Sequence, residues 1–298
     1  MPARCSEAGW RGVAPLLLFV ALVASACGGN AADAARFAPA IDYREADTAT
    51  LIQRANAWTA ASLQAKGQLR MYWSGDDDSR HVDVRLFAAA TGALRLNGRR
   101  SLAGTIFDLV SDGLEFQLVV PDHAAYYTGT SEAPVEPDPE RPYFALRPQH
   151  MTEALLPEVL PTSNSPGAWV VTETYPDRYA LTWMEIAGGE SRIRRRVWIE
   201  RVNLRVSQIE GFDDDGRIEF IADYSDYLGR GAAAYPGSVE VERVWEELTF
   251  RFDFERAEDV VRNPEIPPTA FHVMAVPPGY RVLTIEEAMA EIRREGGR

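Results

Sequence analysis

The chain has 298 residues, of which 46% are hydrophobic and 10% aromatic, so its composition is typical of a folded globular protein and excludes global disorder. Its 44 acidic and 31 basic side chains leave a net charge of −13. This charge argues against a nucleic-acid-binding protein, because such proteins use cations to displace the counterions of phosphates. It also argues against attachment to anionic lipid through charge alone.

The first 26 residues are predicted to be a signal segment. Arg4 and Arg11 supply a basic start, and residues 13–24 form an uninterrupted apolar run. A run of 12 residues is too short to cross a bilayer, which takes about 20 residues, but it fits the apolar region of a secretory signal. We therefore expect the protein to be exported.

Ala24, Ser25 and Ala26 precede Cys27, a pattern that resembles the lipobox of bacterial lipoproteins. In that family the signal is cut before the cysteine, and the thiol carries the lipid. The resemblance implies lipidation of Cys27 and a stable anchor, since two or more acyl chains hold a protein on a membrane where one does not. The alternative is an ordinary signal peptide cut after Ala26, with Cys27 incidental.

Two neighbouring features bear on this anchor. Cys5 lies in the segment that would be removed, so Cys27 is the lone thiol of the expected mature chain and no internal disulfide is predicted. Gly28 stands where Gram-negative lipoproteins retained in the inner membrane tend to carry Asp, and this resemblance favours the outer membrane.

The mature chain is expected to begin with a tether, because residues 27–45 are small and polar and show no lasting period. From residue 47 to 63 the apolar residues recur at helical spacing, with Asp47 or Thr48 as the N-cap. Alternation by two then predicts about six consecutive antiparallel strands. They lie at residues 69–73, 82–86, 94–96, 106–110, 114–120 and 126–127.

Residues 130–166 interrupt this pattern with eight prolines, too many for a sheet, and contain a possible short helix at 148–159. Strands are expected to resume at 179–184, 197–199, 202–212, 218–224 and 248–254, before a terminal helix at 284–294. The prediction is one domain over residues 46–298. It carries the Pro-rich insertion 130–166 and a C-terminal extension at 256–298.

Motifs of enzymes and cofactor sites are missing from the sequence. It contains no HExxH, GxSxG, P-loop or CxxC pattern, and its four histidines are scattered without metal-ligand spacing. We therefore predict a protein that is not an enzyme and needs no cofactor or metal.

Arg192, Arg194 and Arg196 are predicted to share one face of a strand and to face water beside the many carboxylates. Binding of lipid phosphate is the alternative interpretation of this basic run.

The apolar faces of the strands allow two interpretations. Their side chains either fill the core of a sandwich or line a curled sheet that leaves room for an acyl chain. Periodicity alone does not distinguish the two. The residues concerned are Leu69, Met71, Trp73, Val82, Val84, Leu86, Leu94, Leu96, Phe116, Leu118, Phe250 and Phe252.

An amphipathic helix leads into the strand meander, followed by residues 106–113, Pro121 and Tyr126-Tyr127-Thr128-Gly129. This succession resembles the LolA/LolB superfamily of proteins that carry or receive bacterial lipoproteins, over about residues 47–255. The resemblance implies a mainly β fold with a few helices: an unclosed antiparallel β-barrel of about 11 strands, wrapped over helices that form a lid. The segment 148–159 is expected to belong to that lid.

The resemblance also implies a function, which is to shelter the acyl chains of lipids or lipoproteins in a hydrophobic cavity. Cys27 favours the role of a membrane-attached receptor, on the outer membrane and facing the periplasm. A monomer with lipid or lipoprotein partners and no nucleic acid is expected. The alternative function is a sensor or scaffold of the cell envelope that uses the same fold for protein–protein interaction.

Two smaller expectations come from the same resemblance. The receptor of this superfamily carries a protruding loop with an exposed leucine, and Leu102 in the link 98–104 is the matching candidate for membrane insertion. An alternative is that Leu102 packs inward. The arginine that holds the lid in this family has two candidates here, Arg70 and Arg85.

Overall fold

The structure is a computed structural model that describes residues 42–73, 80–100, 104–130, 146–162, 165–231, 234–272 and 274–296. The chain divides into two compact units, Met1–Asp42 and Tyr43–Arg298, and every described residue except Asp42 belongs to the second unit. Cys27, the tether before residue 42, Leu102 and the side chain of Trp73 lie outside the described residues.

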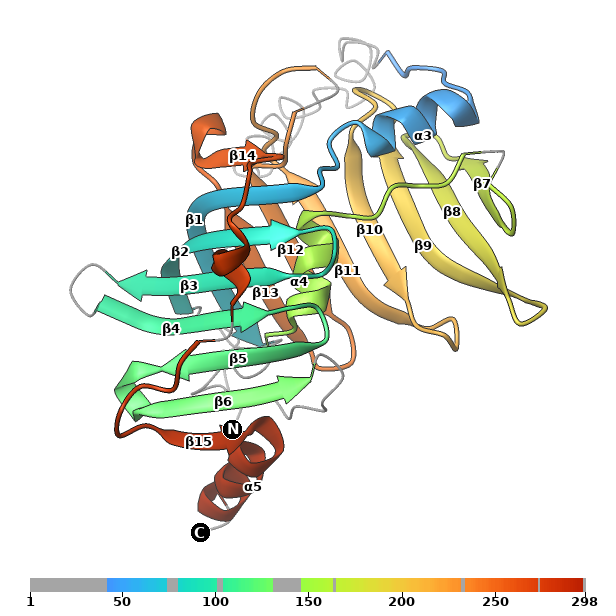
Figure 1. The fold of residues 1–298 in the computed structure, drawn as a ribbon. Helices are drawn as coiled ribbons and strands as arrows, with labels where there is room; N and C mark the ends of the chain where they lie inside the picture. Colours follow the sequence, from blue (N-terminus) through green and yellow to red (C-terminus); the bar gives the residue numbers. More distant parts are fainter. Residues whose placement is uncertain are drawn as a thin grey trace, which may run out of the picture. The chain divides into compact units, whose positions relative to one another are not determined.

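The second unit is built on one large sheet (Figure 1). Its strands follow one another in the order β15-β6-β5-β4-β3-β2-β1-β13-β12-β11-β10-β9-β8-β7, and β14 pairs with β1. The strands are β1 (Ser62–Trp73), β2 (Arg80–Ala89), β3 (Leu94–Arg100), β4 (Gly104–Ser111), β5 (Glu115–Val120), β6 (Ala125–Thr130), β7 (Ala168–Thr174), β8 (Arg178–Ala187), β9 (Glu190–Glu200), β10 (Val206–Phe212), β11 (Ile218–Ser225), β12 (Ser238–Arg243), β13 (Leu248–Asp253), β14 (Val260–Arg262) and β15 (Arg281–Thr284).

The prediction of a mainly β, unclosed sheet is confirmed, because β15 and β7 end the order and do not pair with each other in the described part of the chain. The strand number differs from the prediction: the described residues form fifteen strands, and about eleven were expected. β14 and β15 have three and four residues, too few to show a period of two. β15 also pairs with β6 in parallel, whereas the other pairs are antiparallel.

The helices are α3 (Thr48–Asn56), α4 (Pro148–Leu155) and α5 (Ile285–Gly296), with 3-10 turns η1 (Pro121–His123), η3 (Ala257–Asp259) and η4 (Pro268–Phe271). Asp47 caps α3 as predicted: its carboxylate accepts the Thr50 N–H at 2.8 Å, and hydrogen bonds from Thr50 lower the pKa of Asp47.

Two helices are shorter than predicted. The expected helix over 47–63 ends at Asn56, and β1 begins at Ser62, where buried Leu63 and Ala65 alternate with polar neighbours. The expected helix over 148–159 ends at Leu155, two residues before Pro157, since a proline disfavours helical backbone in the residue that precedes it. The terminal helix lies within two residues of its expected bounds.

In three strand pairs a phenylalanine ring lies over the glycine opposite it in the neighbouring strand. Gly211 lies opposite Phe220 across β10 and β11, and a Cβ atom at Gly211 would lie 2.2 Å from that ring. Gly98 and Phe107 are arranged in the same way across β3 and β4, as are Gly129 and Phe116 across β5 and β6. Each aromatic ring therefore covers the backbone of a glycine, a device that supports curvature in a sheet.

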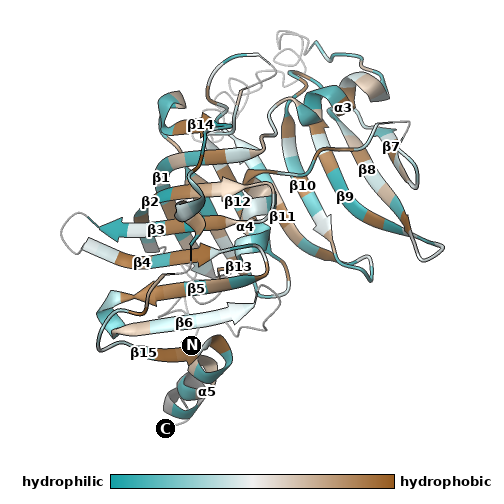
Figure 2. Ribbon diagram, viewed as in Figure 1, coloured by the Kyte–Doolittle hydropathy of each residue, from teal (hydrophilic) through white to brown (hydrophobic). Residues whose placement is uncertain are grey.

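The core lies on one face of the curled sheet. Hydrophobic and hydrophilic bands alternate along the strands (Figure 2), as expected when one face is buried and the other meets water. α4 lies against that buried face and contacts both β2 and β12, which are separated by β1 and β13 in the sheet order. In the described residues no helix is long and apolar enough to cross a membrane.

Candidate functional site

The predicted cavity residues gather on the core face of the sheet. The side chains of the eleven that the structure describes are at most 4% exposed, and all belong to one hydrophobic core. Leu86 and Leu96 stand opposite each other across β2 and β3, and Leu69 stands opposite Phe252 across β1 and β13. The apolar face therefore continues from β3 across β2 and β1 to β13.

The short helix α4 occupies this face. Met151, Ala154 and Leu155 are fully buried and belong to the same core as the strand residues. The segment expected to lie over a cavity as a lid instead packs into the core. A ligand on this face would have to displace α4.

Two buried tyrosines hold the C-terminal end of α4. Tyr224 donates its hydroxyl to the carbonyl oxygen of Ala154 at 3.0 Å, and Tyr235 donates to Leu155 at 2.8 Å. Burial raises the pKa of both hydroxyls, so both remain protonated donors. The ring of Trp58 meets both tyrosine rings edge-on, with centroids 5.1 and 5.7 Å away. These bonds satisfy carbonyl oxygens that a helix end leaves free.

The chain that follows α4 is fixed by α3. The side-chain amide of Asn56 donates to the carbonyl oxygen of Leu160 at 3.1 Å and accepts the Leu160 N–H at 2.9 Å. This paired contact joins the last residue of α3 to the exit of α4.

A buried arginine reaches α4 from β9. Arg195 is 5% exposed, donates to the carbonyl oxygen of Glu158 at 3.2 Å and lies 3.7 Å from the carboxylate of Glu153. Sequence reasoning missed this residue, although its signal was present: Arg195 is the one residue of the run 194–196 that alternation turns toward the core.

The prediction for the rest of that basic run is confirmed. Arg192 pairs with Asp214 at 3.3 Å, Arg194 with Glu185 at 3.6 Å and Arg196 with Glu210 at 3.3 Å. These arginines lie on the outer face of the sheet with charged partners.

The N-terminal half of α4 contacts β11 through His150. His150 lies 3.0 Å from the carboxylate of Glu219 and stacks on Phe220 at 5.4 Å between centroids. The hydrogen bond with His150 lowers the pKa of Glu219. Arg147 and Arg243 are buried nearby, and burial lowers the pKa of Arg243 to about 10.

Neither arginine expected to hold the lid does so. Arg70 lies on the outer face of β1, 3.4 Å from Asp253, and Arg85 is exposed on β2. Both occupy positions that alternate with buried residues, so they point away from α4. The described arginine that binds to α4 is Arg195.

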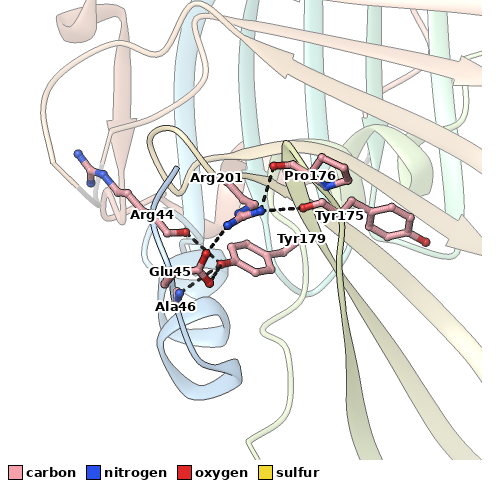
Figure 3. Close-up of polar contacts among 7 residues, drawn as sticks. All are labelled: Arg44, Glu45, Ala46, Tyr175, Pro176, Tyr179 and Arg201. Atoms are coloured by element: carbon pink, nitrogen blue, oxygen red, sulfur yellow. Dashed lines mark hydrogen bonds and ion pairs between the residues drawn. The ribbon is translucent and has the colours of Figure 1, made fainter. Parts of the chain in front are cut away.

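The start of the second unit is clasped to the β8–β9 region (Figure 3). The hydroxyl of Tyr179 donates to the Arg44 carbonyl at 3.0 Å, and the Arg44 N–H donates to the Arg201 carbonyl at 2.8 Å. The Arg201 guanidinium pairs with Glu45 and donates to the Tyr175 and Pro176 carbonyls at 3.1 and 2.9 Å. The chain entering from the expected tether is thus fixed before α3 begins.

No protein-family model matches the chain, and no curated protein matches it in sequence. Solved structures do match its fold. A LolA superfamily protein from Nitrosomonas europaea is 10% identical, with a TM-score of 0.48, over 77% of this chain and 99% of that chain. A putative outer membrane lipoprotein-sorting protein domain from Vibrio parahaemolyticus is 12% identical, with a TM-score of 0.43, over 75% of this chain and 93% of that chain. Each is a similarity of fold at low sequence identity.

Proposed function

We propose that this chain is a non-catalytic binding protein of the cell envelope, anchored through Cys27 to the outer membrane and facing the periplasm. Its core face takes up acyl chains of lipids or lipoproteins when α4 moves out. One observation carries the proposal. The strands on either side of β1 in the unclosed sheet share one continuous apolar face, and a helix of only eight residues covers it. Leu102 would contribute a contact with the membrane.

The energetics of α4 agree with such an exchange. An isolated helix of this length is unstable in water, so its order comes from its surroundings. An acyl chain that replaced α4 would recover the buried apolar contacts at about 0.8 kcal/mol for each methylene. Water can satisfy the carbonyl oxygens of α4 once the helix leaves, whereas the buried hydroxyls of Tyr224 and Tyr235 lose their partners, a cost that the new apolar contacts must offset.

The test weakens the attachment of α4 and leaves the side chains of the apolar face unchanged. Tyr224→Phe with Tyr235→Phe removes both hydroxyl contacts and keeps both rings. Each lost hydrogen bond is worth about 1 kcal/mol. The population of the state in which α4 is displaced should therefore rise about fivefold for each hydroxyl removed. Uptake of a fluorescent fatty acid should rise in this variant, and native mass spectrometry should detect the bound lipid.

Tyr126→Phe is the matched control. It removes the hydroxyl of another buried tyrosine, which donates to the Met274 carbonyl at 3.1 Å and makes no hydrogen bond to α4. Its uptake should equal that of the native chain. If neither the native chain nor the doubly substituted variant takes up fatty acid, the acyl-binding proposal is wrong.

A second function, a protein-binding scaffold or sensor of the envelope, is favoured by the packed core around α4. A protein that never binds lipid needs no empty interior. In-cell crosslinking distinguishes the two functions: a scaffold yields one dominant protein partner, whereas a lipoprotein receptor yields many lipoproteins.

A further inference from the structure

A small pocket lies where the last turn of α3 meets the turn between β9 and β10. Its volume is about 230 Å³. This is below the range of roughly 300–1,000 Å³ typical of pockets for drug-sized ligands, so it suits one charged group and not an acyl chain. It is lined by Arg44, Arg54, Trp58, Asn203, Leu204, Arg205, Val206, Tyr227, Gly231 and Ala234.

The charges that line this pocket are all positive. Within the described residues, the guanidinium groups of Arg44, Arg54 and Arg205 make no ion pair and no hydrogen bond, and Arg205 only stacks on Tyr227 at 5.0 Å. In contrast, the arginines on the outer face of β9 are all paired with carboxylates. Arg44 is exposed, whereas Arg54 and Arg205 are half-buried, and an anion bound in this pocket would be attracted by all three.

The indole of Trp58 supplies an independent sign of a missing ligand. Trp58 lines the pocket and is 2% exposed, and its Nε1–H is buried without a hydrogen-bond partner in the described part of the chain. A buried N–H without a partner is costly. Other buried atoms of the described residues, such as Trp183 Nε1 and His150 Nδ1, also lack a partner, but they do not line this pocket, whereas Trp58 does.

The surrounding backbone holds two of the arginines in place, and the first is Arg205. The side-chain oxygen of Asn203 accepts the Arg205 N–H at 2.7 Å, and its amide donates to Glu200 at 2.6 Å. Leu204, between them, is buried with φ 55°, a left-handed conformation that a leucine adopts at a cost. This strained turn therefore positions Arg205 before any ligand arrives.

Arg44 is positioned by the clasp around Arg201. Its backbone N–H and carbonyl are both bonded, to Arg201 and Tyr179, while its guanidinium points away from the clasp (Figure 3). The backbone contacts of Arg44 thus leave its charge free for the pocket.

We propose that this pocket binds the phosphate group of a phosphomonoester or phosphodiester. The polar side-chain groups that line it are mainly donors, and guanidinium forks match the oxygens of phosphate in pairs. A phosphate offers more acceptor oxygens than a carboxylate to the three arginines, and a phosphomonoester also carries more negative charge. The phosphate belongs either to a small soluble ester or to a lipid headgroup. The proposal does not depend on acyl-chain binding at α4.

The test uses the full chain carrying Cys27→Ser, which cannot bear a thioether-linked lipid. Titration with glycerol 3-phosphate is followed through the indole N–H signal of Trp58 in a ¹⁵N–¹H spectrum, assigned as the signal lost in Trp58→Phe. That signal should shift on binding. Arg54→Gln and Arg205→Gln should each weaken binding by about tenfold, the effect of losing one charge-assisted hydrogen bond.

Arg217→Gln is the matched control. Arg217 also stacks on an aromatic ring near a strand turn, with its guanidinium 6.0 Å from the centroid of Trp245, but it does not line the pocket. It should leave the affinity unchanged. Thermal unfolding of every variant shows that the fold is retained.

The arms of the experiment distinguish the two sources of phosphate. Binding of glycerol 3-phosphate supports a soluble ester. Binding only to vesicles of phosphatidylglycerol, with the same loss in Arg54→Gln and Arg205→Gln, supports a lipid headgroup. Equal binding of acetate overturns the assignment to phosphate. Absence of binding in all arms, or binding that the two arginine variants leave unchanged, overturns the proposal.

Discussion

The core face around α4 and the pocket beside α3 differ in how their polar groups are satisfied. At α4 the hydroxyls of Tyr224 and Tyr235, the terminal nitrogens of Arg195 and the Nε2 of His150 have partners within the protein, whereas Arg195 Nε and His150 Nδ1 are buried without one in the described residues. At the pocket, three guanidinium groups and the Trp58 N–H have none in the described residues. A ligand at the first site must displace contacts that already exist, whereas a ligand at the second adds contacts that are missing. The core face is therefore suited to exchanging α4 for a ligand, and the pocket is suited to recognising a charged group.

The largest expected effect concerns the apolar packing of the core face. Phe252 is fully buried and stands opposite Leu69 and Val239. Phe252→Ala should lower the free energy of unfolding by about 3–5 kcal/mol, because it removes a large buried side chain and leaves a cavity. Urea unfolding measures this loss. A loss below about 1 kcal/mol would mean that the face is loosely packed and already open.

The next effect compares two adjacent arginines of β9. Arg195→Met should cost about 2–3 kcal/mol, since it breaks a buried charged hydrogen bond to Glu158 and removes the cation beside Glu153. Arg194→Met removes an exposed pair with Glu185 and should cost less than about 1 kcal/mol. Urea unfolding of both variants gives the difference. Equal costs would contradict the role of Arg195 in holding α4.

A pH dependence should follow from the contact between Glu219 and His150. The pKa of Glu219 is lower in the folded chain than its ordinary value, chiefly through the hydrogen bond with His150. Its contribution to stability is therefore present above the unfolded pKa, and is lost as the pH falls through the lowered folded pKa. Between pH 7 and about pH 3 the native chain should lose more stability than Glu219→Gln. Urea unfolding across this range provides the measurement, and parallel curves would contradict the prediction.

The smallest expected effect is at the pocket. Arg54→Gln removes one of three unpaired cations, so the free energy of unfolding should change by no more than about 0.5 kcal/mol, and should rise if it changes. Thermal or urea unfolding tests this in the absence of phosphate. A clear destabilisation would show that Arg54 has a structural partner, and the contrast between the two sites would then fail.

Much of the fold was predictable because it depends on local patterns. Alternation by two identified β8, β9, β11 and β13, and Asp47 was correctly expected to cap α3. β7 and β12 were not predicted: Ala168–Thr174 follows the Pro-rich insertion, and Ser238–Arg243 carries only two valines between charged residues. β12 pairs on both sides, with β11 and β13, and β7 pairs with β8 at the end of the sheet, so both depend on neighbours that only the assembled sheet supplies.

The candidate sites were predictable only in part. The apolar residues of the core face share a period that the sequence displays, and eleven of them are buried together. The pocket joins Arg44 and Arg54 to Arg205, about 150 residues away in the chain, and no local spacing relates residues so far apart.

By itself, the sequence determined the mainly β class, the buried face of most strands and the charge pairing of Arg192, Arg194 and Arg196, because each follows from the period of residues close together in the chain. Only the tertiary structure decided that α4 fills the core face, that Arg195 holds it, and that three arginines surround one small pocket. Each of these depends on which distant strands pair, and pairing is chosen by the packing of the whole sheet.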